Sequence, residues 1–254
     1  MLIPLRDDNL IRRPAVATVT IIGLCVAVFL YQETLPGRSG EAFALGFGMI
    51  PSVLFGTNQL DPRIPTIAPW LTIFTSMFLH GGVLHIAGNM IYLWVFGRAM
   101  ESALGPVRLT VFYLLCGVAA ALTQAFIEAD AEVPMIGASG AISGVLGGYL
   151  ILFPRARVLV LFFWGLITTF NVSAKALLLW WIALQLVSIV ISGPQEGGVA
   201  WFAHIGGFVA GMILVHVFRP SRPPLIPIPP TSTWYDPRKG PWGRRPGERR
   251  GPWG

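Results

Sequence analysis

The sequence predicts an all-α membrane protein, a bundle of six transmembrane helices with a long interfacial loop after the first. Three observations predict this class. Of the 254 residues, 54% are hydrophobic and 12% are charged, whereas a soluble domain carries about 25% charged residues. The mean hydropathy is +0.66. Six apolar runs also approach or exceed the ~20 helical residues that cross a bilayer core.

The six runs follow a short N-terminal segment, residues 1–13. Their approximate extents are 14–32, 70–97, 106–127, 136–153, 174–192 and 199–218. The first run has a basic start like a signal peptide, but no small-residue cleavage site follows before Tyr31, so we expect a retained helix. The stretch Val158–Phe170 has only 13 residues and many β-branched side chains. It is too short to span, and we assign it to a re-entrant or interfacial loop.

Charges in the loops orient these runs through the positive-inside rule. With six spans, one side of the membrane receives the basic loop residues Arg6, Arg12, Arg13, Arg98, Arg108, Arg155, Arg157 and Lys175. The other side receives the acidic residues Glu128, Asp130, Glu132 and Glu196. We therefore expect a multi-pass protein, residues 14–218 forming its membrane domain, with both termini in the cytoplasm and the cell membrane as its location.

Two segments outside the runs have distinct compositions. The loop from Glu33 to about Pro69 has about 37 residues, far above the usual 2–8 of bundle connections. Its apolar pieces predict a structured element in the membrane interface. The tail, residues 219–254, holds 8 basic against 2 acidic residues and 10 of the 21 prolines. We expect a disordered cytoplasmic tail attracted to anionic membrane lipid, and no nucleic-acid partner.

Polar side chains inside three of the runs concentrate at one depth. Such groups are costly in a membrane and are functional candidates. Ser139 begins the fourth run, His204 begins the sixth, and His85 and Asn89 lie in the outer part of the second. His85 and Asn89 are four residues apart and share a helix face, whereas His80 is expected to diverge from His85 by roughly 140° in a regular helix.

Glycines predict close packing between the fourth and sixth helices. Small-xxx-small steps are formed by Gly140, Gly144 and Gly148 and by Gly207 and Gly211. Helices packed this closely can bring a serine and a histidine to hydrogen-bonding distance. That pair is a nucleophile with its general base, and donors on the second helix suit the oxyanion that forms beside the serine.

These motifs together resemble the rhomboid intramembrane serine proteases. The motifs are His-x4-His-x3-Asn in the second run, Gly-x-Ser-Gly opening the fourth and Ala-His-x2-Gly-x3-Ala-Gly in the sixth. The match covers all six runs in order, the long first loop and the segment Glu101-x3-Gly105. The resemblance implies that Ser139 is the nucleophile and His204 the base, and that His85 and Asn89 bind the oxyanion. It also implies a supporting role for His80 and for the two motif glycines, Gly137 and Gly140.

The resemblance implies a protease that cuts transmembrane proteins near the outer membrane face without a cofactor. Two positions depart from the family pattern: Leu71 follows Trp70 where arginine is frequent, and Ser143 stands where some members place an aromatic residue against the catalytic imidazole. One alternative is a catalytically inactive rhomboid-like binder of membrane helices. A less favoured one is a metal site on three of the histidines, His80, His85 and His204, which lacks an intramembrane acidic partner.

Overall fold

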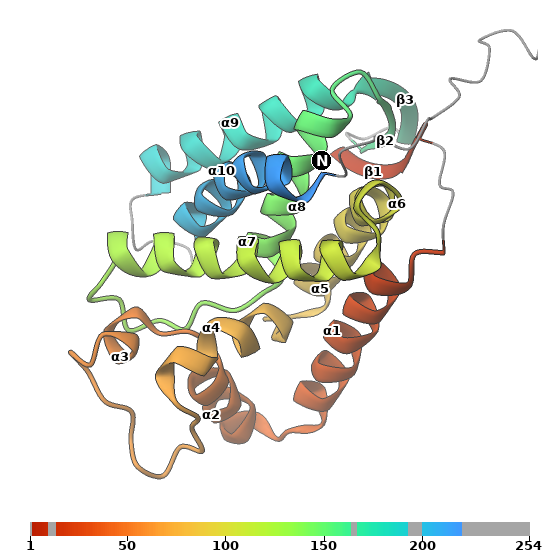
Figure 1. Ribbon diagram of the computed structural model, residues 1–254. Helices are drawn as coiled ribbons and strands as arrows, with labels where there is room; N and C mark the ends of the chain where they lie inside the picture. Colours follow the sequence, from red (N-terminus) through yellow and green to blue (C-terminus); the bar gives the residue numbers. More distant parts are fainter. Residues whose placement is uncertain (1, 10–13, 164–166, 193–199, 220–254) are drawn as a thin grey trace, which may run out of the picture. The chain divides into compact units, whose positions relative to one another are not determined.

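The computed structural model describes residues 2–9, 14–163, 167–192 and 200–219, and these are mostly helical (Figure 1). The helices are α1 (Val16–Thr34), α2 (Gly37–Phe47), α3 (Pro51–Leu54), η1 (Pro69–Leu71), α4 (Thr72–Thr75), η2 (Ser76–Phe78), α5 (Val83–Tyr92), η3 (Leu93–Gly97), α6 (Arg98–Leu104), α7 (Pro106–Ile127), α8 (Ser139–Leu152), α9 (Ala174–Ser192) and α10 (Trp201–Phe218). The predictions for Arg12, Arg13, Glu196 and the tail beyond Arg219 concern residues outside these ranges.

Four helices of the described ranges, α1, α7, α9 and α10, are long and apolar enough to cross a membrane. They match four predicted runs to within about two residues. The segments Pro69–Phe78 and Val83–Leu104 would form a fifth span, but they are bent by 81° at the break between them. The prediction of a continuous helix over residues 70–97 is therefore wrong. With α8 shorter than a span, the helices give four candidate crossings, or five with the bent pair, rather than the predicted six.

Glycine explains the break in the second predicted run. The backbone leaves the helix at Leu79, which is extended, and α5 begins after Gly82, whose φ is +152°. Residues with a side chain rarely adopt that backbone conformation. The chain therefore changes direction where the sequence has two consecutive glycines, Gly81 and Gly82. Beyond the break, α5 continues through the π-helical turn η3 into α6. The bend brings residues before and after it close together, which decides where His80 lies.

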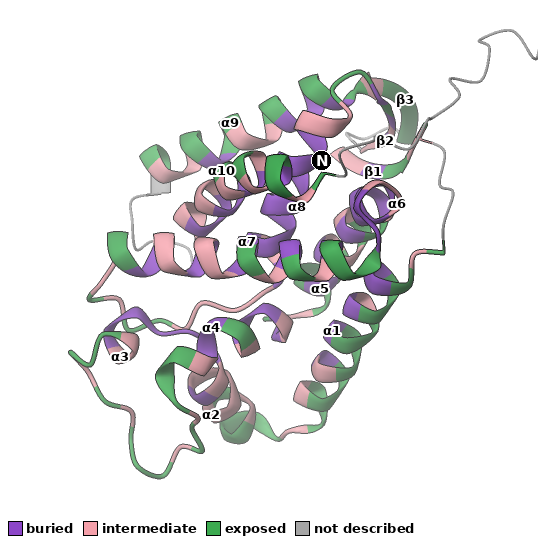
Figure 2. Cartoon of the chain, viewed as in Figure 1, coloured by how far each residue is buried: buried purple, intermediate pink, exposed green. Residues whose placement is uncertain are grey.

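Helix α8 is the centre of the bundle. Every residue from Gly140 to Leu150 is buried (Figure 2), although α8 is only about 21 Å long at ~1.5 Å per residue. A Cβ atom on Gly207 or Gly211 of α10 would collide with a carbonyl oxygen of α8. The prediction that these two helices approach closely through their glycines is confirmed.

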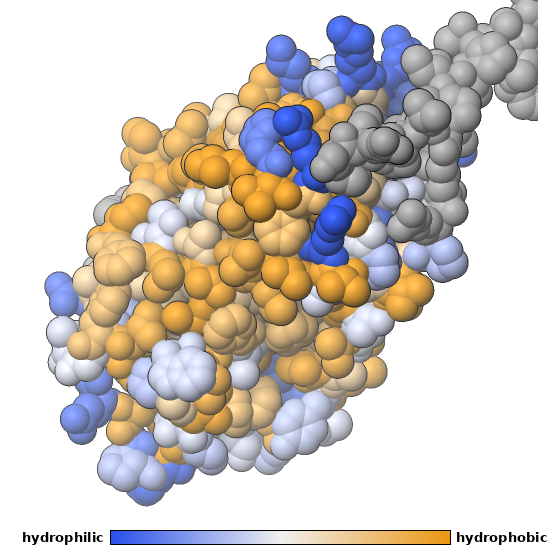
Figure 3. Space-filling model, viewed as in Figure 1, coloured by the Kyte–Doolittle hydropathy of each residue, from blue (hydrophilic) through white to orange (hydrophobic). Residues whose placement is uncertain are grey.

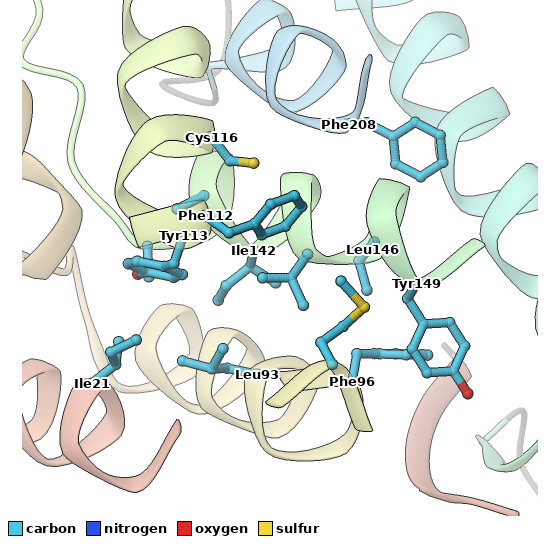
Figure 4. Close-up of a cluster of buried hydrophobic side chains, with 14 of the residues drawn as sticks. Ile21, Leu93, Phe96, Phe112, Tyr113, Cys116, Ile142, Leu146, Tyr149 and Phe208 are labelled. Carbon is cyan, nitrogen blue, oxygen red and sulfur yellow. The ribbon is translucent and has the colours of Figure 1, made fainter. Parts of the chain in front are cut away.

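Large apolar side chains surround the other faces of α8. Leu146 and Tyr149 of α8 pack among Phe96, Phe112 and neighbouring side chains (Figure 4). The Phe96 and Tyr149 rings meet edge to face with centroids 4.9 Å apart. This arrangement holds α8 rigidly between α7, α10 and the helices after the bend, so the first residue of α8 has a fixed place.

A three-stranded antiparallel sheet follows α8. Its strands are β1 (Leu2–Asp7), β2 (Arg157–Phe163) and β3 (Ile167–Ser173), in the order β1-β2-β3. The assignment of Val158–Phe170 to a loop is thus wrong. Its β-branched residues form two strands, and a segment more than 150 residues away in sequence supplies the third. Because β2 follows the C-terminal end of α8, the sheet and Ser139 lie at opposite ends of that helix.

Hydrophobic side chains cover most of the face shown in Figure 3, and hydrophilic side chains gather mainly toward its two ends. Exposed apolar residues occur on all four long helices, among them Leu24, Leu30, Leu115, Leu184, Val187 and Ile213. Large exposed apolar surfaces of this kind suit contact with lipid. Within the long first loop, α2 and α3 form the structured part, and its place in the membrane interface remains a prediction.

Candidate active site

A cavity of about 420 Å³ opens among α5, α8, α9 and α10. Its wall includes the polar side chains of His85, Asn89, Ser139, Gln185 and His204. Four separate helices supply these residues, so the cavity forms only when the bundle is assembled. Its size and its few convergent polar groups are typical of a ligand or catalytic site.

Ser139 and His204 are hydrogen-bonded in this cavity. The Ser139 Oγ and His204 Nε2 atoms are 2.8 Å apart, and 9% of His204 is exposed. Ser139 is the first residue of α8, and His204 lies in the first turn of α10. The close glycine contacts between the two helices therefore set this distance. A hydroxyl hydrogen-bonded to an imidazole can be activated as a nucleophile.

The segment before Ser139 is extended and held on both sides. Met135 exchanges two backbone hydrogen bonds with Met49 of the first loop, at 2.8 and 3.1 Å. The Gly137 N–H donates to the carbonyl of Ser76 at 2.8 Å, and Gly137 has a φ of +123°. The chain thus turns into α8 directly before Ser139. The N–H groups of a first helical turn have no partner within the helix, so α8 directs backbone donors towards the serine.

His85 and Asn89 supply two further donors near Gly137. A Cβ atom on Gly137 would lie 2.8 Å from His85 Nε2 and 3.7 Å from Asn89 Nδ2, so both nitrogens converge on one point. The Gly81 N–H donates to His85 Nδ1 at 3.3 Å. Nδ1 is therefore an acceptor, and the proton of the neutral ring is on Nε2. Asn89 Nδ2 is buried without a hydrogen-bond partner among the described residues, so it is free to donate to a group that enters the cavity.

The His204 ring is held from α9. Its Nδ1 atom is 2.8 Å from Gln185 Oε1, and the Trp181 ring lies beside it with centroids 5.8 Å apart and the planes inclined by 44°. On the other side, the Trp201 ring meets the imidazole edge to face at 6.0 Å. Some family members place an aromatic residue against the catalytic imidazole four residues after the serine, where this chain has Ser143. Here the aromatic contacts to His204 come from Trp181 of α9 and Trp201 of α10.

Ser143 has a structural hydrogen bond. It is fully buried, and its hydroxyl donates to the Ser139 carbonyl at 2.6 Å, one turn back along α8. Serine in a membrane helix commonly makes this bond. Because its proton is already donated to the backbone, Ser143 is a poor competitor to Ser139 as a nucleophile.

His80 lies closer to His85 than the sequence predicted. Their ring centroids are 5.2 Å apart, edge to face, because the bend at Gly82 replaces the regular helix on which the predicted divergence depended. His80 does not line the cavity. Its backbone N–H donates a hydrogen bond to Gln32 Oε1 at 3.1 Å. Within the described ranges, no group of three His, Cys, Asp or Glu side chains is placed to hold a metal ion.

Gln185 and Gln124 are the polar residues near the histidine that the motif analysis missed. Gln124 of α7 accepts a hydrogen bond from the Ala203 N–H at 3.1 Å and donates to Glu128 at 2.7 Å, so it caps the start of α10 directly before His204. Gln185 interrupts an apolar run. That signal is the same as the one that singled out Ser139 and His204, namely a polar group inside a span.

Residues 67–221 match the family model described as Rhomboid domain. RHOMBOID-like protein 4 of Arabidopsis thaliana is 29% identical over 87% of this chain and 55% of its own length. The Rhomboid protease GluP of Bacillus subtilis is 29% identical over 52% of this chain and 24% of its own length. Inactive rhomboid protein 1 of Bos taurus is 29% identical over 63% of this chain and 17% of its own length. The chain therefore spans about half of the first relative and smaller parts of the others.

Proposed function

This chain belongs to the rhomboid family, and we propose that it is an intramembrane serine protease that hydrolyses peptide bonds of transmembrane proteins. The observation that carries the proposal is the 2.8 Å hydrogen bond between Ser139 Oγ and His204 Nε2, made inside a cavity. The protease GluP is among the relatives and supports the same activity class.

In the proposed reaction, Ser139 Oγ attacks the carbonyl carbon of the scissile peptide bond, and its proton passes to His204 Nε2. The C–N bond then breaks, and His204 returns that proton to the leaving amine. A water molecule next attacks the carbonyl carbon of the acyl-enzyme, and His204 takes a proton from it. The ester C–O bond to Ser139 then breaks, and His204 returns the proton to Ser139 Oγ, which restores the enzyme. The reaction leaves a free carboxylate and a free amine, and it needs no cofactor.

Stabilisation of the tetrahedral intermediate is assigned to three groups. These are His85 Nε2–H, Asn89 Nδ2–H and the backbone N–H groups at the start of α8. The convergence of the two side-chain nitrogens beside Gly137 supports this role, and so does the unpartnered state of Asn89 Nδ2. An oxyanion placed between them would be bound by preorganised donors, which is where much of the rate enhancement of such enzymes arises.

The proposed substrates are membrane helices that unwind near their outer end. Peptide bonds within a helix are shielded, so residues that weaken a helix, such as Gly and Pro, favour cleavage.

The proposed topology has six crossings. Although α8 is shorter than a lipid-exposed span, it is buried inside the bundle, and we propose that it crosses the membrane there together with α1, the bent segment from Pro69 to Leu104, α7, α9 and α10. An even number keeps Arg98, Arg108, Arg155 and Lys175 on one side with both termini, which the positive-inside rule makes cytoplasmic.

A second candidate is a catalytically inactive binder of membrane helices, favoured by the similarity to the bovine inactive rhomboid protein 1. Such a protein would bind the same class of partner through the same cavity. The Ser139–His204 hydrogen bond argues against it, because a binder has no need for an aligned nucleophile and base.

The test uses a fluorophosphonate probe on the detergent-solubilised chain, with mass spectrometry to locate the adduct, and cleavage of a model membrane substrate. We expect an adduct on Ser139, and loss of both adduct and cleavage in Ser139→Ala and His204→Ala. Ser143→Ala is the matched control, since it removes a serine one turn away that donates to the backbone, and it should keep labelling. Wild-type chain that is neither labelled nor cleaves, yet binds membrane helices, would favour the inactive binder.

A further inference from the structure

Gln185 is the buried polar residue of a helix that mostly faces outward. Leu184, Leu186 and Val187 of α9 are exposed, whereas Gln185 is only 7% exposed. It lies one turn after Trp181, on the face of α9 that borders the cavity. A buried amide without hydrogen-bond partners is costly in a membrane. The partners of its oxygen and nitrogen atoms therefore indicate the role of Gln185.

Those contacts determine the orientation of the amide. Gln185 Nε2 donates to the Trp181 carbonyl oxygen at 3.2 Å. A carbonyl oxygen only accepts hydrogen bonds, so the nitrogen of the amide must be the atom that faces it. The oxygen, Oε1, is then the atom that faces His204 Nδ1 at 2.8 Å.

The amide orientation in turn determines the tautomer of the imidazole. Oε1 is an acceptor, so His204 Nδ1 must carry a proton and donate it. In the neutral ring, Nε2 then has a free lone pair, and this is the atom 2.8 Å from Ser139 Oγ. Every donor in the series points the same way: Ser139 to His204, His204 to Gln185, and Gln185 to the backbone of α9.

We propose that Gln185 is a positioning residue that holds His204 in the Nδ1–H tautomer and aims its Nε2 atom at Ser139. The inference rests on the proposed protease function and extends the dyad to a third residue on a third helix. During the reaction the Ser139 proton moves to Nε2, while the Nδ1 proton stays hydrogen-bonded to Oε1. Gln185 therefore gains and loses no proton.

An amide suits this position better than a carboxylate for a physical reason. A carboxylate would stabilise the charged imidazole more strongly, but it would leave a buried charge in the low-dielectric interior whenever the imidazole is neutral. The amide orients the ring without that cost. Trp181 and Trp201 then limit rotation of the ring about its remaining bonds.

The first test compares Gln185→Met with Leu186→Met. Methionine approximates the shape of glutamine without its acceptor, and the neighbouring Leu186 is exposed on the same helix, so its variant controls for methionine on α9. We expect Gln185→Met to lower the rate of fluorophosphonate labelling at Ser139 and kcat by about tenfold, the value of one hydrogen bond, with KM unchanged. Labelling at the rate of Leu186→Met would overturn the inference.

The second test is the pH profile of Gln185→Glu, which separates positioning from packing. A carboxylate at this position keeps an acceptor for Nδ1–H and adds a negative charge, which favours the protonated imidazole. His204 must be neutral to act as a base, so the acid limb of the pH–rate profile should move to higher pH by about one unit or more. An acid limb at the wild-type pH would overturn the inference. Absence of Ser139 labelling in the wild-type chain would instead refute the protease function itself.

Discussion

At Gly137 there is no room for a Cβ atom beside the His85 ring, so the substitution Gly137→Ala tests the oxyanion site most directly. Its φ is +123°, a conformation in which an L-residue is strained by about 1–3 kcal/mol. The new Cβ would also lie 2.8 Å from His85 Nε2 and 2.9 Å from His85 Cε1. Ordinary contact requires about 3.5 Å, so the imidazole must move by roughly 0.7 Å or more.

The expected result has two parts. The free energy of unfolding should fall by about 1–3 kcal/mol through backbone strain. Labelling of Ser139 by the fluorophosphonate should also slow by about 10²- to 10³-fold, because His85 no longer reaches the oxyanion. Asn89 Nδ2 is 3.7 Å from the new atom, an ordinary contact, and it should stay in place.

Gly56→Ala is the matched control. Gly56 also has a positive φ, +76°, but a Cβ there meets nothing within 4 Å. It should lose about 1–2 kcal/mol of stability through strain alone and label at the wild-type rate. Thermal unfolding in detergent and labelling kinetics measure the two effects separately. If Gly137→Ala labels as fast as Gly56→Ala, then His85 does not serve the oxyanion and the assignment of this site is refuted.

Three further predictions follow from other contacts. Asn89→Ala should slow Ser139 labelling by about 10²- to 10³-fold with little change in thermal stability, since its amide nitrogen has no protein partner to lose among the described residues; an unchanged rate would remove it from the site. Glu101→Ala should lower the free energy of unfolding by about 2–4 kcal/mol, measured by thermal or denaturant unfolding. The buried side chain of Glu101 caps α1, because it accepts hydrogen bonds from the Ala17 N–H, the Thr18 N–H and the Thr18 hydroxyl at 2.7–2.9 Å. A loss no larger than that of the exposed substitution Glu33→Ala would contradict this role. Burial raises the pKa of Asp7 above its ordinary value of 3.8, more than its hydrogen bonds from Asn9 and Tyr149 lower it. Its contribution to holding β1 is therefore full below pH 3.8 and declines as the pH rises through the folded-state pKa. The protection of β1 amides from exchange, corrected for the exchange rate of an unfolded chain at each pH, should fall over that range in wild type and not in Asp7→Asn, and equal pH dependence in both would disprove the assignment.

Local patterns in the sequence were sufficient to predict a mostly helical membrane protein and to choose candidate residues, although the prediction of an all-α fold missed the three-stranded sheet. Four of the predicted runs are the long apolar helices α1, α7, α9 and α10. The glycine steps correctly indicated that α8 and α10 pack closely. These properties depend on residues a few positions apart, since hydrophobicity, glycine spacing and charge act through the helix on which they lie.

Features that depend on distant residues were decided by the tertiary structure. The bend at Gly82 overrode the helical period of the second run and placed His80 against His85. The strands β2 and β3 pair with each other, and β2 also pairs with β1, which lies more than 150 residues earlier in the sequence. The β-branched residues of this stretch favour strands, but only the distant segment completes the sheet. Likewise, the partner of Gln185 lies on another helix. Hydrogen bonds between helices leave no periodic trace in a sequence, because they arise only after packing has fixed which faces meet.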